Sequence, residues 1–251
     1  MLQEALNLRP SLYADELVWM IWDLFGVWVS KDTVLRWLRK SDWRKKRIRF
    51  IATERDQELR NDWIRRLCQW KHYHLVFVDE SAANERTKDR KHGWAPIGVR
   101  PTEKRTQKRS ERWSVLPAYT SSGYITHEIY QGSYNTERFN QFIAERVLPL
   151  CNPFPAPHSV IVLDNASIHR SPELRAMCEV KGVRLEFLPP YSPDYNPIEE
   201  SFAELKAWMR KYRDLADSFD GNFAGFIELA VQSLTNKAGR HFITSCISLN
   251  D

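Results

Sequence analysis

The sequence has no apolar run approaching the roughly 18 residues that a membrane-spanning helix needs, and its N-terminus lacks a secretory signal pattern. Its four cysteines are scattered without a Cys-x-x-Cys pair, which argues against a disulfide framework and a zinc ribbon. Reduced thiols in a cytosolic or nuclear compartment are therefore expected. Internal repeats and low-complexity tracts are also missing, so one large domain, or a small and a medium one, is expected.

Hydrophobic residues and positive charge are both well represented. The 251 residues are 43% hydrophobic, which is enough for a packed core. Lysine and arginine number 37 against 32 acidic residues, giving a formal net charge of +5. A basic chain suits a polyanionic partner such as nucleic acid, but charge alone does not identify one.

The first 50 residues predict a pair of helices. Residues 13–25 are mostly apolar and are followed by Gly26, a common helix stop. Ser30 is a good N-cap for a second helix over 31–39. Two helices joined by a short turn with a glycine are typical of a helix-turn-helix, although an amphipathic pair that merely packs fits equally well.

A polar face and a basic run in this region suggest contact with DNA. The outer face of the second helix would enter a major groove, and the run over 44–49 would neutralise phosphates. The same run also fits a nuclear localisation signal or a solvated linker. The candidate DNA-binding residues here are Thr33, Arg36, Lys40, Arg44, Lys45, Lys46 and Arg47.

A charged helix over 52–73 is expected to link this region to the rest of the chain. Residues 84–112 are polar and strongly basic, and they include Trp94. Such a segment can hold a DNA strand by charge and stacking, or it can be a solvated loop with one anchoring aromatic residue. The candidate DNA-binding residues here are Lys104, Arg105, Lys108 and Arg109.

Two apolar, β-branched runs predict buried strands at 75–78 and 159–163, and each is followed by an acid, Asp79 and Asp164. A carboxylate after a buried strand lies where open α/β sheets place their sites. A hairpin is expected over 113–130, between the two strands. Helix and strand patterns then alternate along the chain, which indicates an α/β fold.

A third acid follows a proline-rich loop. In the helix after that loop, Ile198, Phe202, Leu205, Met209 and Tyr212 follow a 4-3-4-3 spacing and predict the core face. Glu199 then lies on the shoulder of that face. Glu200 lies nearly opposite, toward water with Glu204 and Lys211. The alternative is that Glu199 only completes an N-terminal capping box with Asn196 and Pro197.

Three motifs together resemble the catalytic core of mariner-type DDE transposases over roughly residues 70–215. They are Asp79, the string Asp-Asn-Ala-Ser-Ile-His from Asp164 to His169, and Pro-Pro-Tyr-Ser-Pro-Asp-Tyr-Asn-Pro-Ile-Glu ending at Glu199. The 34 residues between Asp164 and Glu199 match the spacing of that family and select Glu199 over Glu200. One acid at a strand end would be a weak signal, whereas the long string with this spacing is specific.

The resemblance implies a ribonuclease H-like α/β domain with a mixed sheet, preceded by a small all-α helix-turn-helix segment. It further implies that Asp79 bridges two metal ions, that Asp164 binds one and that Glu199 binds the other. Water would first nick double-stranded DNA, and the freed 3′-hydroxyl would attack target DNA. Family members act as homodimers and carry two helix-turn-helix units, of which the first is expected to be missing here.

The residues themselves also favour a divalent metal. Three gathered carboxylates repel one another unless cations intervene, and all-oxygen ligands suit Mg²⁺ or Mn²⁺. Two ions can activate a nucleophile and stabilise a leaving oxygen in phosphoryl transfer. Asn165 and His169 are possible supporting residues, with a hydrogen-bonded structural role preferred for His169. Asp194 fits a turn.

The predicted organisation is a helix-turn-helix segment over 1–50, a linker and helix over 51–73, a catalytic domain over 74–215 and a helical tail over 216–251. The alternative function is a catalytically inactive DNA-binding protein derived from a transposase. A dehalogenase-type phosphatase is disfavoured because Asp79 begins no Asp-x-Asp motif. The expected location is the nucleus of a eukaryotic host, or the cytoplasm and nucleoid of a bacterial one.

Overall fold

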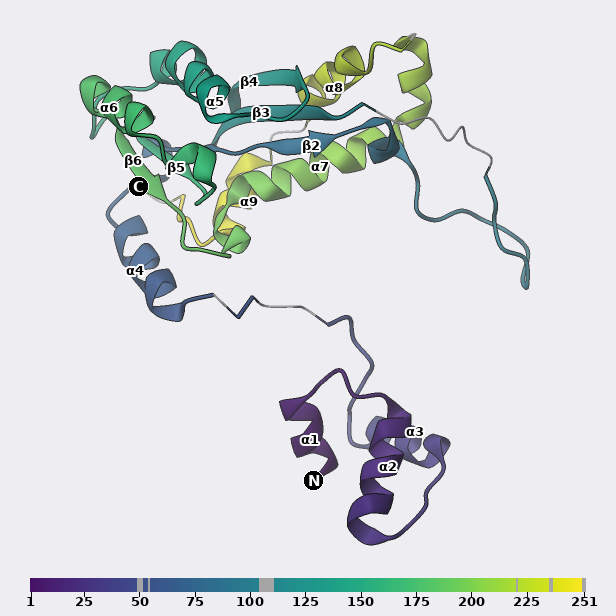
Figure 1. Cartoon of the computed structure of the whole chain (residues 1–251). Helices are drawn as coiled ribbons and strands as arrows, with labels where there is room; N and C mark the ends of the chain where they lie inside the picture. Colours follow the sequence, from purple (N-terminus) through teal and green to yellow (C-terminus); the bar gives the residue numbers. More distant parts are fainter. Residues whose placement is uncertain (49–51, 54, 104–110, 220, 235–236, 250–251) are drawn as a thin grey trace. The chain divides into compact units, whose positions relative to one another are not determined.

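The computed structural model describes residues 1–48, 52–53, 55–103, 111–219, 221–234 and 237–249. The chain divides into two compact units, a first unit over Met1–Thr53 and a second over Glu54–Asp251 (Figure 1). No helix in the described ranges is long and apolar enough to cross a membrane.

The first unit is a small all-helical body. It contains α1 (Leu2–Leu8), α2 (Ala14–Phe25) and α3 (Lys31–Lys40), so the two expected helices are confirmed to within one residue. Gly26 ends α2 in the left-handed conformation, with φ of 65°. The Ser30 hydroxyl begins α3 by accepting a hydrogen bond from the Thr33 N–H at 3.2 Å. The buried core of this unit consists of Leu6, Leu17, Val18 and Val34.

The second unit is built on a six-stranded mixed sheet in the order β2-β3-β1-β5-β6, with β4 on β3. The β1–β5 and β5–β6 pairs are parallel, whereas β3 is antiparallel to β1, β2 and β4. The strands are β1 (Leu75–Val78), β2 (Ser81–Ala83), β3 (Trp113–Thr120), β4 (Gly123–Gln131), β5 (Val160–Leu163) and β6 (Arg184–Phe187).

Strand β2 was not expected from the sequence, because three residues are too few for a periodic signal. Val78 pairs with Ala118 and Ser81 pairs with Val115, so β1 and β2 keep one register along β3. Strand β2 therefore continues β1 alongside β3, after a break at Asp79 and Glu80.

Helices cover both faces of the sheet (Figure 1). One face packs on α5 (Thr136–Phe142), which continues as a π-turn to Val147, and on α6 (Pro172–Lys181). The other face packs on α4 (Gln57–Leu67), α7 (Pro197–Lys211), α8 (Phe223–Gln232) and α9 (Ala238–Thr244).

The strand side chains alternate between these faces, as a period of two requires. In β1, Val76 and Val78 lie in the cluster with α5 and α6. Leu75 and Phe77 lie in the cluster with α4, α7 and α9. This alternation decides where the residues that follow β1 point.

The expected linker over 51–73 and tail over 216–251 do not form separate segments. Trp63 of α4 and Phe242 of α9 are both fully buried in one cluster with Phe77 of the sheet. Their apolar side chains make the linker helix and the tail part of the core of the second unit. Helix α9 lies within the expected helical tail, but its bounds were not predicted, since seven residues give little periodicity.

Candidate active site

Asp79 and Asp164 come together because they follow neighbouring parallel strands. In the pairing of β1 with β5, Phe77 lies opposite Val162. Two residues further along, the same register places Asp79 opposite Asp164. Alternation turns both carboxylates toward the face that α7 covers. The sequence placed both acids at strand ends, and the register now makes them neighbours.

Asp79 is the most enclosed acid of the site, with 8% of its surface exposed. Its Oδ1 accepts the Glu80 N–H at 2.8 Å, and its Oδ2 accepts the Asn196 Nδ2–H at 2.8 Å. Burial raises the pKa of Asp79 to about 7, and the charges of Asp164 and Glu199 add to the shift. The three acids are therefore near enough to oppose one another's ionisation.

Asp164 is ionised more easily than Asp79. Burial by itself would raise its pKa, but hydrogen bonds from His169 and from the Ala166 N–H outweigh burial and hold the pKa below its usual value. Both donors reach Oδ1, at 2.6 Å from His169 Nδ1 and at 2.9 Å from the Ala166 nitrogen. Within the described part of the chain, Oδ2 accepts no hydrogen bond.

His169 is a fully buried bridge between two acids. Its Nε2 lies 3.2 Å from Glu80 Oε2, and its ring packs on Phe139 of α5 at a centroid distance of 4.2 Å. Burial would lower the pKa of His169, but hydrogen bonds to Asp164 and Glu80 raise it to about 9. At neutral pH both ring nitrogens therefore carry protons and donate, in line with the hydrogen-bonded role preferred from the sequence.

Sequence reasoning missed Glu80 as a member of this group. Its neighbour Asp79 points to the α7 face, so alternation turns Glu80 toward the α5 face, where His169 lies. An acid directly after Asp79 was the available signal. Its partner, 89 residues away, was not predictable from spacing.

The core face of α7 is confirmed except at its end. Ile198, Phe202, Leu205 and Met209 are buried, whereas Tyr212 lies beyond the last helical turn and is 37% exposed. The helix therefore presents its first turn to the two strand ends.

Glu199 lies in this first turn with part of its surface open to water. Partial burial raises the pKa of Glu199. The positive charge of Lys206 lowers this pKa, and the negative charge of Asp164 raises it. The expectation that Glu200 faces water holds in part: its side chain is 41% exposed, but its Oε2 lies 3.9 Å from His241 Nε2. Glu204 faces the same ring at 3.9 Å, because α9 covers the side of α7 that was expected to face water.

Asn196 does not cap α7 with its side chain, as the alternative explanation of Glu199 required. It holds the N-cap position of α7, but its side chain makes no capping hydrogen bond and donates to Asp79 instead. Its Oδ1 is buried and accepts no hydrogen bond within the described residues. Asn165 has a related role after β5, because its amide donates to the Leu188 carbonyl and receives the Arg170 guanidinium. It thereby ties the end of β5 to the proline-rich loop.

Asp194 lies outside the acid group. Its carboxylate accepts hydrogen bonds from both Arg60 Nη atoms, at 3.2 and 2.9 Å, and from Arg55 Nη2 at 2.8 Å. The Arg60 guanidinium also stacks on Tyr195 with its carbon 4.0 Å from the ring centroid. These contacts fasten α4 to the loop that carries Asn196 and leads into α7.

The chemistry of the site suits a hard divalent cation. All the donors are oxygens, the acids raise one another's pKa, and the buried Asn196 Oδ1 lacks a donor that a hydrated ion would supply. No group of three acidic, histidine or cysteine side chains in the described residues already stands at ligating spacing. Asp79, Asp164 and Glu199 would therefore move their side chains to hold an ion.

The candidate DNA-binding residues of the first unit are exposed. Thr33, Arg36 and Lys40 lie on the surface of α3, and Lys45 to Arg47 lie in the extended segment after it. Arg44 folds back, donating to the Arg39 carbonyl at 2.8 Å and to that of Trp43 at 3.1 Å. In the basic segment of the second unit, Trp94 is fully exposed. Lys104, Arg105, Lys108 and Arg109 lie outside the described residues.

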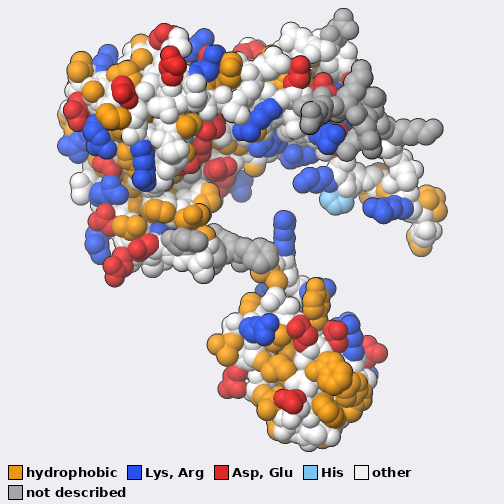
Figure 2. All heavy atoms as spheres, in the orientation of Figure 1, with side chains coloured by type: hydrophobic (Ala, Val, Ile, Leu, Met, Phe, Trp, Pro, Cys, Tyr) orange, Lys and Arg blue, Asp and Glu red, His pale blue; other side chains and the backbone are white. Residues whose placement is uncertain are grey.

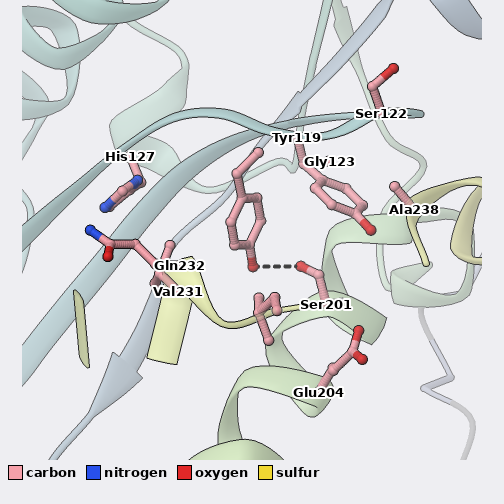
Figure 3. A pocket seen from close by; sticks show the side chains of 11 residues that line it. Tyr119, Ser122, Gly123, His127, Ser201, Glu204, Val231, Gln232 and Ala238 are labelled. Atoms are coloured by element: carbon pink, nitrogen blue, oxygen red, sulfur yellow. Dashed lines mark hydrogen bonds between the residues drawn. The ribbon is translucent and has the colours of Figure 1, made fainter. Parts of the chain in front are cut away.

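A cavity of about 320 Å³ lies elsewhere in the second unit (Figure 3). It is bounded by the β3–β4 hairpin, α7 and the segment from α8 to α9, and Tyr124 Oη lies 2.8 Å from Ser201 Oγ across it. None of the three acids lines it. The acid site lies apart from this cavity, where β1 and β5 end.

Solved structures share this fold. They include the Mos1 strand transfer complex, with a TM-score of 0.68 and 20% identity over 97% of this chain and 73% of that one. The Mos1 mariner paired end complex with Mn has a TM-score of 0.67 and 17% identity over 97% and 74%. The mariner Mos1 paired end complex with Mg has a TM-score of 0.61 and 19% identity over 100% and 79%. A search of the curated proteins found no match.

These likenesses confirm the expected fold, a ribonuclease H-like mixed α/β domain preceded by a helix-turn-helix unit. The pattern of the winged helix-turn helix family matches residues 12–67, which include α2, α3 and α4. The missing first helix-turn-helix unit stays a prediction. The pattern of the DDE superfamily endonucleases matches residues 74–220, which is more than half of the chain. This span contains Asp79, Asp164 and Glu199, and the chain therefore belongs to the DDE superfamily endonucleases.

Proposed function

We propose that this endonuclease is a mariner-type transposase, or is derived from one, and that it cuts and joins DNA strands with divalent metal ions. The observation that carries the proposal is the register of β1 with β5, which sets Asp79 beside Asp164 on the face covered by α7. Glu199 enters from the first turn of α7, after the 34-residue spacing of that family.

Asp79, Asp164 and Glu199 would hold two Mg²⁺ or Mn²⁺ ions. When bound, such ions supply charge neutralisation and an activated nucleophile for in-line attack on phosphorus. The protein contributes the orientation of the ligands: Asn196 and the Glu80 N–H fix Asp79, and His169 and the Ala166 N–H fix Asp164. Hydrolysis of a phosphodiester leaves a 3′-hydroxyl, which then attacks a phosphodiester of target DNA and releases a new 3′-hydroxyl.

The proposed partners are double-stranded DNA and a second copy of this chain, within the nucleus or nucleoid. The similar Mos1 structures are described as strand transfer and paired end complexes, which supports both partners. The exposed polar face of α3 and the basic segment after it supply a surface for DNA. A catalytically inactive DNA-binding protein remains the alternative, and the doubly hydrogen-bonded carboxylates argue against it.

The test is nicking of supercoiled plasmid with Mg²⁺ or Mn²⁺ by the whole chain, by Asp164→Ala and by Glu199→Ala. We expect nicking that depends on the metal and falls to background in both variants, since each removes a metal ligand. Glu200→Ala is the matched control and should nick as the parent does, because Glu200 faces α9. A parent that binds plasmid without nicking it would instead support the inactive DNA-binding protein.

A further inference from the structure

The solvent-facing side of α7 links the acid site to a cleft of basic residues. Glu199 and Arg210 are eleven residues apart, which is three turns plus about 20°, so they lie on one side of the helix. Ala203 and Lys206 fall between them on the same line, and Ala203 is exposed while Lys206 is half-buried. Lys206 already lowers the pKa of Glu199 through its charge. We call these four residues the α7 stripe.

The far end of the stripe opens into a cleft lined only by basic side chains. It is lined by Arg90, Lys91 and His92 from one segment and by Arg210 and Lys211 from the end of α7. Figure 2 shows several Lys and Arg side chains, with a histidine among them, gathered in one region of the second unit.

The two walls of the cleft are joined by Arg90. Its Nε donates to the Arg210 carbonyl at 3.1 Å and its Nη2 donates to the Lys211 carbonyl at 3.0 Å. These bonds satisfy carbonyls at the end of α7 and fix the segment beside the helix. Asp214 lies 3.9 Å from Arg90, but no described acid lies within ion-pair distance of Lys91, Arg210 or Lys211. Arg90 also lowers the pKa of Glu103 through its charge, so Arg90 is partly compensated, whereas Lys91, Arg210 and Lys211 leave the cleft with a net positive charge among the described residues.

We infer that the DNA strand flanking the cut bond lies along the α7 stripe and that the basic cleft binds its phosphates. This inference rests on the proposed DNA cleavage, and it adds the path of the substrate. Eleven residues of α-helix span about 16.5 Å. At about 3.4 Å per base pair, the cleft binds phosphates roughly five base pairs from the phosphate that is cut. The small Ala203 side chain lets a sugar-phosphate backbone approach the helix between the two ends.

The test measures binding of a labelled random-sequence duplex to the whole chain without divalent metal, over a series of salt concentrations. Lys91→Ala/Lys211→Ala should lower the slope of log affinity against log salt by about 1.8, which is about 0.9 for each phosphate that the protein no longer neutralises. Between 50 and 200 mM salt, the affinity advantage of the parent should then shrink about tenfold. Lys91→Arg/Lys211→Arg keeps the charge and should restore the slope.

Matched controls separate the cleft from general charge loss. Arg175→Ala/Lys181→Ala removes the same charge from exposed positions at α6 and should leave the slope unchanged. Ala203→Glu puts a negative charge in the middle of the stripe and should weaken duplex binding at least tenfold. Ala176→Glu makes the same change on exposed α6 and should not.

The inference is overturned if Lys91→Ala/Lys211→Ala and Ala203→Glu bind duplex with the same affinity and salt dependence as their α6 controls. This holds even when the parent nicks plasmid. If the parent binds duplex through the cleft but nicks nothing under any metal, the proposed cleavage fails while the basic cleft stands. A parent that binds no duplex overturns both.

Discussion

At the scale of single residues, His169 decides whether Asp164 is held in one orientation. The buried ring has one donor for Asp164 at Nδ1 and another for Glu80 at Nε2. Groups that orient metal ligands typically change activity or metal affinity by about 10- to 100-fold when they are removed. His169 contacts the ligand and not the reacting atoms, so it is a positioning residue.

Two substitutions separate the two donors. In His169→Asn the side-chain amide reproduces the Nδ1 position, and in His169→Gln it reproduces the Nε2 position. We therefore expect His169→Asn to retain most plasmid nicking and most Mn²⁺ affinity, whereas His169→Gln loses about 10- to 100-fold of both. Mn²⁺ affinity can be followed by the electron paramagnetic resonance of the free ion. Equal losses in the two variants, together with equal losses of thermal stability, would reduce His169 to a packing residue.

The sequence indicated the three acids and named His169 as a possible support, but it did not indicate the roles of Asn196 and Glu80. Asp79 and Asp164 were visible because each ends an apolar run, and Glu199 because of its spacing and helical phase. Asn196 holds the N-cap position that the alternative interpretation gave it, but its amide donates to Asp79, since N-cap position and hydrogen-bond partner are separate properties. Glu80 and His169 meet only after the sheet assembles, and such pairs leave no local pattern.

At the scale of elements, the ion pair between Arg60 and Asp194 fixes α4 against the loop that enters α7. The Arg60 side chain is 7% exposed and that of Asp194 is 34% exposed. Removing one partner of a buried pair leaves a charge without compensation. The strands and long helices were predictable from periodicity, but this contact joins residues 134 positions apart and was not.

We expect Asp194→Ala to lower the free energy of unfolding by on the order of 2–3 kcal/mol, somewhat less than for a fully buried pair because Asp194 is partly exposed. Urea unfolding followed by tryptophan fluorescence measures this. In Arg60→Met/Asp194→Ala the more buried of the two guanidiniums that lose their partner is gone, so part of the loss should be recovered, while Arg55, at 16% exposed, keeps its charge. If the double variant is as unstable as Asp194→Ala or more so, the destabilisation comes from poorer loop packing and not from the buried charge.

At the scale of the whole molecule, the acid site makes the metal-free protein sensitive to pH. The pKa of Asp79 is raised to about 7 in the folded chain, so the folded state binds more protons than the unfolded state between about pH 4 and 7. Its contribution therefore favours folding at low pH and is lost as pH rises through this window. The pKa of His169, raised to about 9, gives stability below about pH 6.5 that is lost as pH rises to 9.

Asp79→Asn should remove the dependence of folding stability on pH between about 4 and 7, and it should leave the dependence between about pH 6.5 and 9 in place. Relative to the parent, the variant should gain stability as pH rises from 4 to 7, by at most about 4 kcal/mol for a shift of about three pKa units. Thermal unfolding with a chelator present, compared at pH 4, 7 and 9, measures the difference. A difference that stays constant over this range would show that Asp79 titrates normally.

The uninterrupted register of β1 and β2 along β3 has a consequence for how this chain can vary. Asp79 and Glu80 are adjacent in sequence but serve opposite layers, one with α7 and the other with His169 and α5. Deleting one residue of β1 would turn Asp79 toward the α5 layer and bring Glu80 to the place of Asp79 on the α7 layer. The charge of the chain could stay the same, yet the longer glutamate would then stand beside Asp164 and Ser81 would take the place of Glu80. The length of this strand is thus as much a part of the active site as the acids it carries.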